Sequence, residues 1–345
     1  MNIGIVGANG YGGVELLRLL QHHPFVKIKK IVSHSTQGNS ITHIYPHLNN
    51  VYDMNLEAMN VPEIASNVDL LFFATPSGVS KEVIPQFLEQ GITCIDLSGD
   101  FRLKNKGEYE KWYKQTHGTT AYLQSAVYGL SEVFREKIPE AKLISNPGCY
   151  PTAALLGLIP VLKAKMIDPN SIIIDGKSGV SGAGRNLSLG NAYAEINENV
   201  KAYKLAEHQH TPEIEQVINE ISGENTNISF TTHLVPMTRG IMCTTYCQLT
   251  EKVTTEKLID LYKSTYEQDY FIRIRPKGVW PATKEVYGSN FCDIGLVVDE
   301  RTNRLIIVSV IDNLVKGAAG QAIQNMNLIN GWDEKTSLQT VPIYP

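Results

Sequence analysis

One cysteine stands in a setting that favours chemistry over packing. Cys149 lies in the stretch SNPGCYPTA, between a Pro-Gly turn and Pro151. An apolar run before the turn predicts a strand, and a proline suits the first turn of a helix because the donor it lacks would stay unpaired there. The pattern therefore places Cys149 at a helix N-terminus, where unpaired amides and the helix dipole stabilise a thiolate. Such a thiolate predicts attack on an acyl group and a thioester intermediate.

A thiolate that attacks acyl groups needs a partner that handles protons on the substrate oxygen near neutral pH, and histidine suits this role. The stretch AEHQHTPEIEQ places His208 and His210 just before a threonine and a proline that read as a helix start. We interpret His208 as the acid/base and His210 as its support. No third ligand accompanies this pair, so we expect no metal site. The histidines expected at the surface are His22, His23, His34, His43, His47 and His117.

The remaining cysteines read as structural. The chain holds five cysteines without a CxxC pair, which argues against a disulfide framework and fits a reducing cytoplasm. We therefore expect a cytoplasmic protein. The four cysteines expected to be buried in apolar strands are Cys94, Cys243, Cys247 and Cys292.

A glycine-rich turn at the N-terminus indicates a dinucleotide site. GANGYGG follows the first apolar run and opens a helical pattern, with glycines at Gly7, Gly10 and Gly13. The usual fingerprint has its second glycine one residue earlier, so this is a variant. The turn still allows a close backbone approach and rests a pyrophosphate on a helix N-terminus. We also expect Asn9 and Tyr11, in the same turn, to contact the cofactor.

The second predicted strand favours NADP(H) over NAD. NAD-selective sites usually end this strand with a carboxylate, whereas this one ends IVSHST. Ser33 and Ser35 could donate hydrogen bonds to a 2′-phosphate that no carboxylate repels. The stretch ATPSG ends another strand at the edge where such sheets bind ligands, so Thr75, Pro76 and Gly78 join the predicted cofactor site.

The 345 residues suggest two domains. Strand and helix patterns alternate over the first 150 residues, which predicts a parallel doubly wound, Rossmann-like α/β domain. Longer β-rich runs follow, which predicts an α+β domain around a mostly antiparallel sheet. A final helical pattern over 314–330 is expected to return to the first domain. We therefore place the dinucleotide-binding domain at 1–148 and 314–345, and the catalytic domain at 149–313.

Composition excludes several classes of protein. The net charge is −4, so no strong basic field attracts nucleic acid. The longest apolar runs fall far short of the roughly 20 residues of a membrane span. The N-terminal stretch MNIGIVGANG lacks a basic region before an apolar one, so it reads as a strand and not as a signal peptide.

Several stretches together resemble the N-acetyl-gamma-glutamyl-phosphate reductase family. They are SNPGCYPTA, GANGYGG, KSGVSGAGR, EHQHTPEI, VPMTRGI and DNLVKGAAGQA, in order along almost the whole chain. The resemblance implies an NADP-binding domain and a catalytic domain that also makes subunit contacts, in a homodimer or homotetramer. It implies reduction of N-acetyl-L-glutamyl 5-phosphate to N-acetyl-L-glutamate 5-semialdehyde with release of phosphate, through a thioester on Cys149 and aided by His208. It also implies that Pro147, Ser178, Gly179 and Asn313 lie near the nicotinamide.

The implied substrate carries an acyl phosphate and a carboxylate, and arginines hold such groups in bidentate fashion. Arg102 follows a predicted strand end in SGDFRL, and Arg185 and Arg239 are further candidates. We expect these arginines and His210 to contact the substrate, without assigning either anionic group.

Three alternatives remain open from the residues. An aspartate-semialdehyde dehydrogenase would share the fold and the chemistry. An NADP-binding redox sensor without turnover would need a resolving cysteine near Cys149, and none is near in sequence. A purely structural oligomerisation protein would leave the glycine turn unexplained.

Overall fold

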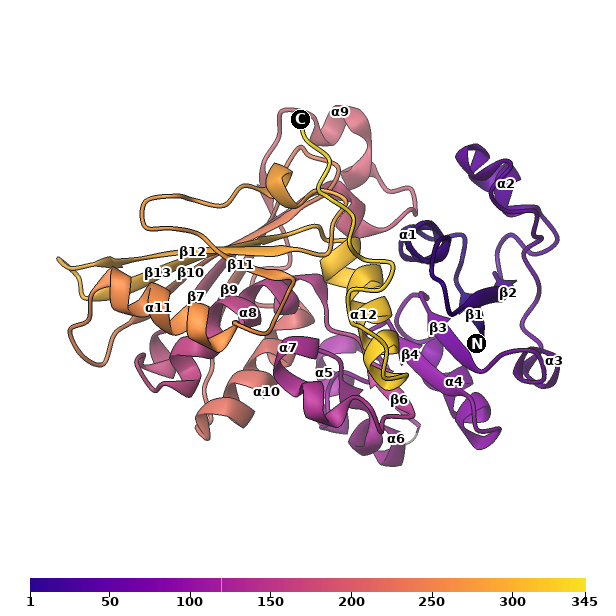
Figure 1. Cartoon of the computed structure of the whole chain (residues 1–345), viewed down its shortest axis with the longest axis horizontal. Helices are drawn as coiled ribbons and strands as arrows, with labels where there is room; N and C mark the ends of the chain where they lie inside the picture. Colours follow the sequence, from indigo (N-terminus) through magenta and orange to yellow (C-terminus); the bar gives the residue numbers. More distant parts are fainter. Residues whose placement is uncertain (119) are drawn as a thin grey trace. The chain divides into compact units, whose positions relative to one another are not determined.

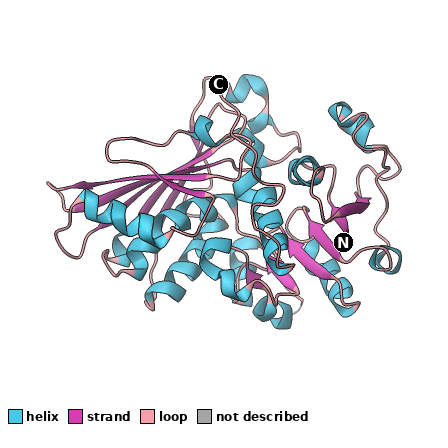
Figure 2. Cartoon of the chain, viewed as in Figure 1, coloured by secondary structure: helices cyan, strands magenta, loops and turns pink. Residues whose placement is uncertain are grey.

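The computed structural model describes residues 1–118 and 120–345 and divides the chain into two compact units. The first contains Met1–Gly148 and Ala318–Gln339, and the second contains Cys149–Gly317 and Thr340–Pro345. Each has its own sheet, drawn in magenta in Figure 2.

The first unit is built on a six-stranded parallel sheet with the order β2-β1-β3-β4-β6-β5. The strands β1, β3, β4 and β6 are short, mostly apolar and buried on both faces, as covered parallel sheets require. Strand β2, at one edge, alternates exposed lysines with half-buried residues over its first four positions. The strands are β1 (Asn2–Val6), β2 (Lys27–Val32), β3 (Leu70–Phe73), β4 (Thr93–Asp96), β5 (Val127–Tyr128) and β6 (Leu143–Ser145). The helices are α1 (Tyr11–Leu20), α2 (Ile41–Ile44), α3 (Val61–Ala65), α4 (Ser80–Glu89), α5 (Lys106–Tyr113), α6 (Thr120–Ser125), α7 (Ser131–Phe134) and α12 (Gly320–Ile329).

The register of this sheet aligns the carboxyl ends of five strands. Val6 pairs with Val32 and Phe73, and Asp96 pairs with Phe73 and Ser145. The segments that follow these residues therefore leave from one edge of the sheet, which is where doubly wound sheets bind ligands. They include the glycine turn, the end of β2, the ATPSG stretch and the start of the SNPGC stretch.

The second unit holds a seven-stranded mixed sheet with the order β11-β12-β13-β10-β7-β9-β8. Most neighbours are antiparallel, while β11 with β12 and β7 with β9 are parallel. The strands are β7 (Ile173–Ser178), β8 (Lys201–Ala202), β9 (Ser229–Leu234), β10 (Ile241–Gln248), β11 (Ile272–Ile274), β12 (Cys292–Asp299) and β13 (Arg304–Ile311). The helices are α8 (Cys149–Lys163), α9 (Tyr193–Ile196), α10 (His210–Ser222) and α11 (Thr255–Thr265).

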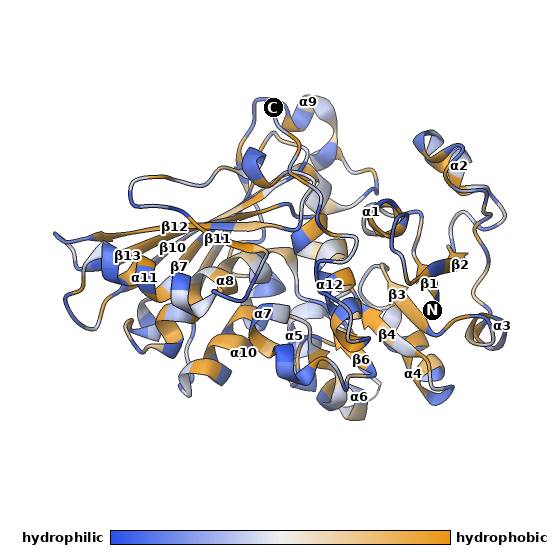
Figure 3. Ribbon diagram, viewed as in Figure 1, coloured by the Kyte–Doolittle hydropathy of each residue, from blue (hydrophilic) through white to orange (hydrophobic). Residues whose placement is uncertain are grey.

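Helices cover one face of this sheet (Figure 1). Helix α8 contacts β10 and β13, and α10 and α11 pack against α8. Every residue from Tyr150 to Leu162 is buried, because the helix is apolar on all sides. Strand β10 alternates buried and half-buried residues, so its half-buried side chains point to the face of the sheet away from α8. The strands are mainly hydrophobic in Figure 3, as this packing requires.

The end of the chain is divided differently from our expectation. We expected all of 314–345 in the first domain, but residues 314–317 and 340–345 group with the second unit. The carboxylate of Asp312 accepts hydrogen bonds from the amides of Leu314 and Val315, which ties this segment to the end of β13. The Ile343 amide donates to the carbonyl of Tyr287 at 2.9 Å, which holds the C-terminal segment there.

Candidate active site

Cys149 is the first residue of α8, as the sequence predicts, and its side chain is partly exposed. All five cysteines are thiols, and the other four are 0–1% exposed. Burial raises the pKa of the Cys94, Cys243 and Cys247 thiols, which holds them protonated. Cys149 therefore has the accessibility and the helix N-terminal position that a nucleophile needs.

The turn before Cys149 is held by buried hydrogen bonds of Asn146. In the first unit, the Asn146 amide donates to the Asp96 carbonyl at 2.8 Å, and its side chain donates to the Ala318 carbonyl at 3.1 Å. The Arg102 guanidinium donates to the Asn146 carbonyl at 2.9 Å. In the second unit, a Cβ on Gly317 would lie 2.8 Å from the Cβ of Cys149, so the Cys149 backbone fits only beside a glycine.

His208 lies just before α10 and is 7% exposed. Its Nδ1 accepts a hydrogen bond from the backbone amide of His210 at 3.1 Å. In a neutral imidazole the other nitrogen, Nε2, then carries the proton. Burial, with a smaller effect from the Lys204 charge, lowers the pKa of His208 to about 3. His208 is therefore a neutral ring near pH 7 that offers an Nε2–H donor.

The glycine turn between β1 and α1 has the geometry that the sequence predicts. Gly7 has a φ of +84°, which favours glycine, and a Cβ there would lie 2.4 Å from the Ala74 carbonyl oxygen. A Cβ on Gly13 would lie 2.4 Å from the Gly7 carbonyl oxygen. Gly10 caps α1 without a side-chain hydrogen bond, and Tyr11 begins the helix, whose first turn has no acidic residue. The first amides of α1 therefore form a site that fits an anion.

The end of β2 brings Ser35 to the glycine turn, whereas Ser33 turns inward. The Asn9 side-chain amide donates to the Ser35 hydroxyl at 3.0 Å, and Ser35 is exposed. Ser33 is 2% exposed, and its hydroxyl lies 2.9 Å from that of Thr36. Ser35 is therefore better placed than Ser33 to meet a ligand on this turn.

The segment after β3 fits a bound cofactor. The Thr75 hydroxyl is buried and has no hydrogen-bond partner among the described residues, whereas Pro76 beside it is exposed. Gly78 has a φ of +101°, and its amide donates to both carboxylate oxygens of Asp100 at 2.8 Å. A buried hydroxyl without a partner costs free energy, and a ligand polar group would remove that cost. Together with the glycine turn, these residues fit a dinucleotide.

The predicted nicotinamide contacts of the second unit lie close to one another. Ser178 ends β7, and a Cβ on Gly179 would lie 2.8 Å from the Thr238 carbonyl oxygen. The Asn313 side chain accepts from the Gly240 amide at 2.7 Å and donates to the Ser181 hydroxyl at 2.9 Å. Asn313 thus braces the loops around Ser178. Pro147, in the first unit, is buried in the turn before Cys149.

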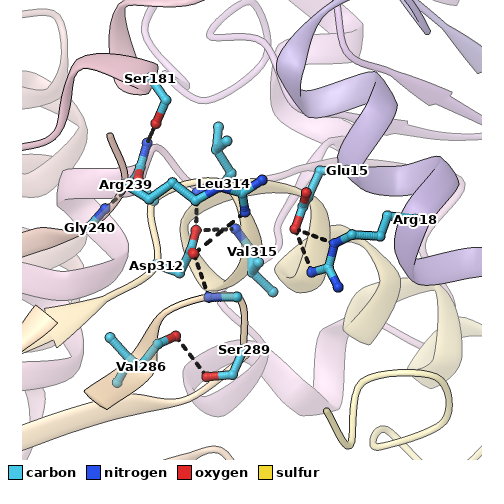
Figure 4. A network of polar contacts seen from close by, with 12 residues as sticks. Glu15, Arg18, Ser181, Arg239, Gly240, Val286, Ser289, Asp312, Leu314 and Val315 are labelled. Atoms are coloured by element: carbon cyan, nitrogen blue, oxygen red, sulfur yellow. Dashed lines mark hydrogen bonds and ion pairs between the residues drawn. The ribbon is translucent and has the colours of Figure 1, made fainter. Parts of the chain in front are cut away.

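The three candidate arginines differ in their surroundings. Arg102 is 6% exposed, and its guanidinium also donates to the Leu97 carbonyl at 2.8 Å. Arg239 Nη1 lies 3.6 Å from a carboxylate oxygen of Asp312, as Figure 4 shows, and the guanidinium lies over the Tyr287 ring. Arg185 is exposed. A substrate role for each arginine stays a prediction.

Two histidines expected at the surface are buried. His117 is 1% exposed, because its ring packs edge-on against Phe101 and Tyr109. His23 is 5% exposed, and its Nε2 lies 2.9 Å from the Asn327 side-chain oxygen. Their sequence neighbours are polar, so only the packing of distant segments reveals this burial.

Among the described residues, no group of three or more His, Cys, Asp or Glu side chains is arranged to hold a metal ion. The helices of the described ranges also include none long and apolar enough to cross a membrane.

Comparisons with known proteins agree with this geometry. The family model of the semialdehyde dehydrogenase NAD binding domain matches residues 2–141, and that of the dimerisation domain matches residues 149–313. The N-acetyl-gamma-glutamyl-phosphate reductases of Bacillus subtilis (strain 168) and Geobacillus sp. (strain WCH70) are 55% and 54% identical over 345 residues, with 100% of both chains covered in each case. The chain belongs to the N-acetyl-gamma-glutamyl-phosphate reductase family. The predicted family, and its class of NADP-dependent oxidoreductase, are thus confirmed.

Solved structures share the fold of this reductase family. Aspartate semialdehyde dehydrogenase II from Vibrio cholerae, complexed with ASA, has a TM-score of 0.73 and 20% identity, covering 96% of this chain and 98% of that one. Aspartate semialdehyde dehydrogenase with NADP from Candida albicans has a TM-score of 0.69 and 15% identity, covering 95% and 98%. The predicted α/β fold class, with an NAD(P)-binding domain and a second domain around a mixed sheet, is confirmed.

Proposed function

We propose that this chain catalyses the NADPH-dependent reduction of N-acetyl-L-glutamyl 5-phosphate to N-acetyl-L-glutamate 5-semialdehyde and phosphate, a step of arginine biosynthesis. The observation that carries this proposal is the 55% identity to a reductase of that name over the full chain. The partly exposed thiol of Cys149 at the start of α8 supports the chemistry. We assign cofactor binding mainly to residues 1–148 and 318–339, and catalysis to residues 149–317.

In the proposed mechanism, the thiolate of Cys149 attacks the acyl carbon of the substrate. Its sulfur forms a bond to that carbon, and the bond to the phosphate oxygen breaks, which gives a thioester and free phosphate. NADPH, when held by the proposed cofactor residues, would supply the hydride that reduces the acyl carbon. When the C–S bond then breaks, the aldehyde forms and Cys149 leaves as a thiolate.

His208 stabilises the substrate oxygen during these steps. Because the ring is neutral and Nδ1 is occupied by the His210 amide, its Nε2–H is the group available for donation. A neutral Nε2–H donor stabilises the oxygen as negative charge develops on it. For Nε2 to give its proton to the oxygen, the ring must also take up a proton at Nδ1, so acid/base work passes between the imidazolium and the neutral ring. We propose His208 as the acid/base on this basis.

We propose further roles for the residues predicted to bind ligands. The substrate is anionic at two groups, and Arg102, Arg185, Arg239 and His210 are the proposed contacts. The proposed cofactor contacts are Gly7, Asn9, Gly10, Tyr11, Gly13, Ser33, Ser35, Thr75, Pro76, Gly78, Pro147, Ser178, Gly179 and Asn313. The open first turn of α1 and the Thr75 hydroxyl support this set.

A substrate comparison tests the proposed function. With NADP and phosphate in the oxidative direction, we expect N-acetylglutamate semialdehyde to give a kcat/KM at least about 100-fold above that of aspartate semialdehyde, because the site must pair the polar groups of its own substrate. A preference for aspartate semialdehyde would identify the aspartyl enzyme. Binding of NADP without turnover of either aldehyde would favour the redox-sensor alternative.

We propose that the chain forms a homodimer or homotetramer in the cytoplasm. The match to a dimerisation domain over 149–313 supports the subunit contact. The register of the second sheet puts Ile173, Tyr246 and Ile306 side by side on the face away from α8, where all three stay partly exposed. A second copy would bury this apolar strip.

Light scattering of the purified protein checks the oligomer. We expect a mass of two or four times 38.3 kDa, and we expect Tyr246→Lys to reduce it. A wild-type mass of one chain at micromolar concentration would contradict the proposal. Lys263, on the exposed side of α11, offers a control in Lys263→Gln, which should leave the mass unchanged.

A further inference from the structure

We propose that Tyr150, Tyr203 and Phe230 form an aromatic cage that holds the His208 ring in one orientation and one tautomer, and that they act as positioning residues for the reaction. This inference rests on the proposed function, in which His208 is the acid/base. The three rings come from α8, from the segment after β8 and from β9, all within the second unit.

The cage surrounds His208 with ring edges and faces. The ring centroids of Tyr150, Tyr203 and Phe230 lie 5.6, 5.7 and 5.5 Å from that of His208, with interplanar angles of 89°, 66° and 76°. Tyr150 and Phe230 also contact each other edge-on at 5.4 Å. Edge-on packing at these distances is favourable and fixes the ring that it encloses.

Hydrogen bonds hold the two tyrosines of the cage in place. The Tyr203 hydroxyl donates to the Tyr150 hydroxyl at 3.2 Å, which donates to the His233 carbonyl at 3.4 Å. The Thr232 hydroxyl donates to the Tyr203 carbonyl at 2.5 Å, and this bond ties the Tyr203 segment to β9.

A glycine on β7 makes room for the cage. A Cβ on Gly176 would lie 2.5 Å from Tyr150 Cε1 and 3.4 Å from Phe230 Cε2. Any side chain at this position would displace the Tyr150 ring or a neighbour. Gly176 thus has a packing reason to be glycine, although it lies within a strand.

Groups that can carry charge act on His208 and its cage: Lys204 on the His208 ring, and Cys149 on Tyr150 and Tyr203. Lys204, from the Tyr203 segment, opposes protonation by its charge, and His210 from α10 lies 4.7 Å away between ring centroids. Burial raises the pKa of Tyr150 above its usual value and that of Tyr203 to about 12, so both phenols stay neutral. Burial is also the main cause of the lowered pKa of His208. The cage therefore keeps His208 neutral with Nδ1 on the His210 amide.

Removing one aromatic ring of the cage should allow the His208 ring to change its orientation and tautomer. Tyr203 is half-buried, so Tyr203→Ala is the first variant, and Phe230→Leu is the second, since it retains apolar volume without the ring. Nitrogen-15 NMR of His208 in the ligand-free protein reports tautomer and titration together. We expect the wild type to show the Nε2–H tautomer and no titration between pH 5 and 8.

Both Tyr203→Ala and Phe230→Leu should change the nitrogen-15 spectrum of His208. We expect mixed tautomers and a titration midpoint that rises by about two pH units or more, into the range between pH 5 and 8, because water reaches the ring. Tyr203→Phe keeps the ring and should restore the wild-type spectrum. The acid side of the kcat profile should move in the same direction, with KM largely unchanged.

Two controls separate the cage from other causes. Phe271→Leu removes a buried ring elsewhere in the second unit and should leave the His208 spectrum unchanged. Lys204→Met removes the nearby charge alone. If Tyr203→Ala and Phe230→Leu both fold and both give the wild-type spectrum, the proposal is overturned. A shift seen only in Lys204→Met would overturn it too. The spectra need no substrate, so this failure is distinct from failure of the aldehyde assay.

Discussion

The Cys149→Ser variant should lose at least about 10³-fold in kcat while its affinity for NADP stays within about twofold. A serine hydroxyl at this position is a far weaker nucleophile than a thiolate, and the helix N-terminus of α8 cannot ionise it near pH 7. Apart from Pro147, which lies on the turn before Cys149, the proposed cofactor residues lie on other segments, and the exchange of one side-chain atom leaves their geometry unchanged. Steady-state kinetics and fluorescence titration with NADPH measure the two effects separately.

We expect the loss of kcat to come from the position of Cys149 in the active site, and not from the removal of a cysteine sulfur as such. Cys94→Ala is the matched control, because Cys94 is 0% exposed in β4. It should cost some stability through the small cavity that it leaves, but it should retain near-wild-type kcat. Near-wild-type turnover in Cys149→Ser would reject the thioester mechanism.

The second large effect is expected from His208→Asn. Loss of the Nε2–H donor should lower kcat by about 10²–10⁴-fold, the usual range for a general acid/base, with little change in NADP affinity. His43 is exposed on α2, so His43→Asn is a matched control that should retain full activity. A loss of less than tenfold in His208→Asn would remove this residue from the mechanism.

The pH dependence of stability gives a second test of His208. In the unfolded chain a histidine takes up a proton near pH 6.5, whereas in the folded protein burial lowers the pKa of His208 to about 3. The unfolded state therefore binds more protons between these values, and the folded protein loses stability as the pH falls from 6.5 toward 3. Denaturant unfolding at pH 7 and pH 4.5 should show a smaller drop in His208→Asn than in the wild type.

Local signals explain what could be predicted about the active site. The start of α8 at Cys149 follows from a Pro-Gly turn and a nearby proline, and the turn at Gly7 and Gly13 follows from glycine spacing beside an apolar run. These features depend on residues a few positions apart, so they are visible along the chain. The same holds for the hairpin of β12 and β13, which flank the turn sequence DERTNR.

Contacts between segments that are far apart along the chain could not be predicted from the sequence. Tyr150 stands next to Cys149, yet nothing near it in the sequence shows that its ring packs against His208. Arg102 was predicted from its place after a strand, but its guanidinium bonds to the carbonyls of Leu97 and Asn146 only because β4 and β6 are neighbours. Strand order is a property of the whole sheet and leaves no local pattern.

The sequence by itself determined the two kinds of sheet, the glycine turn and the helix start at Cys149, because short-range spacing and periodicity encode them. The tertiary structure alone decided how His208 is protonated. Its surroundings come from α8, β9 and the segment after β8, and desolvation by these distant segments sets the charge of a histidine that in isolation would titrate near neutral pH.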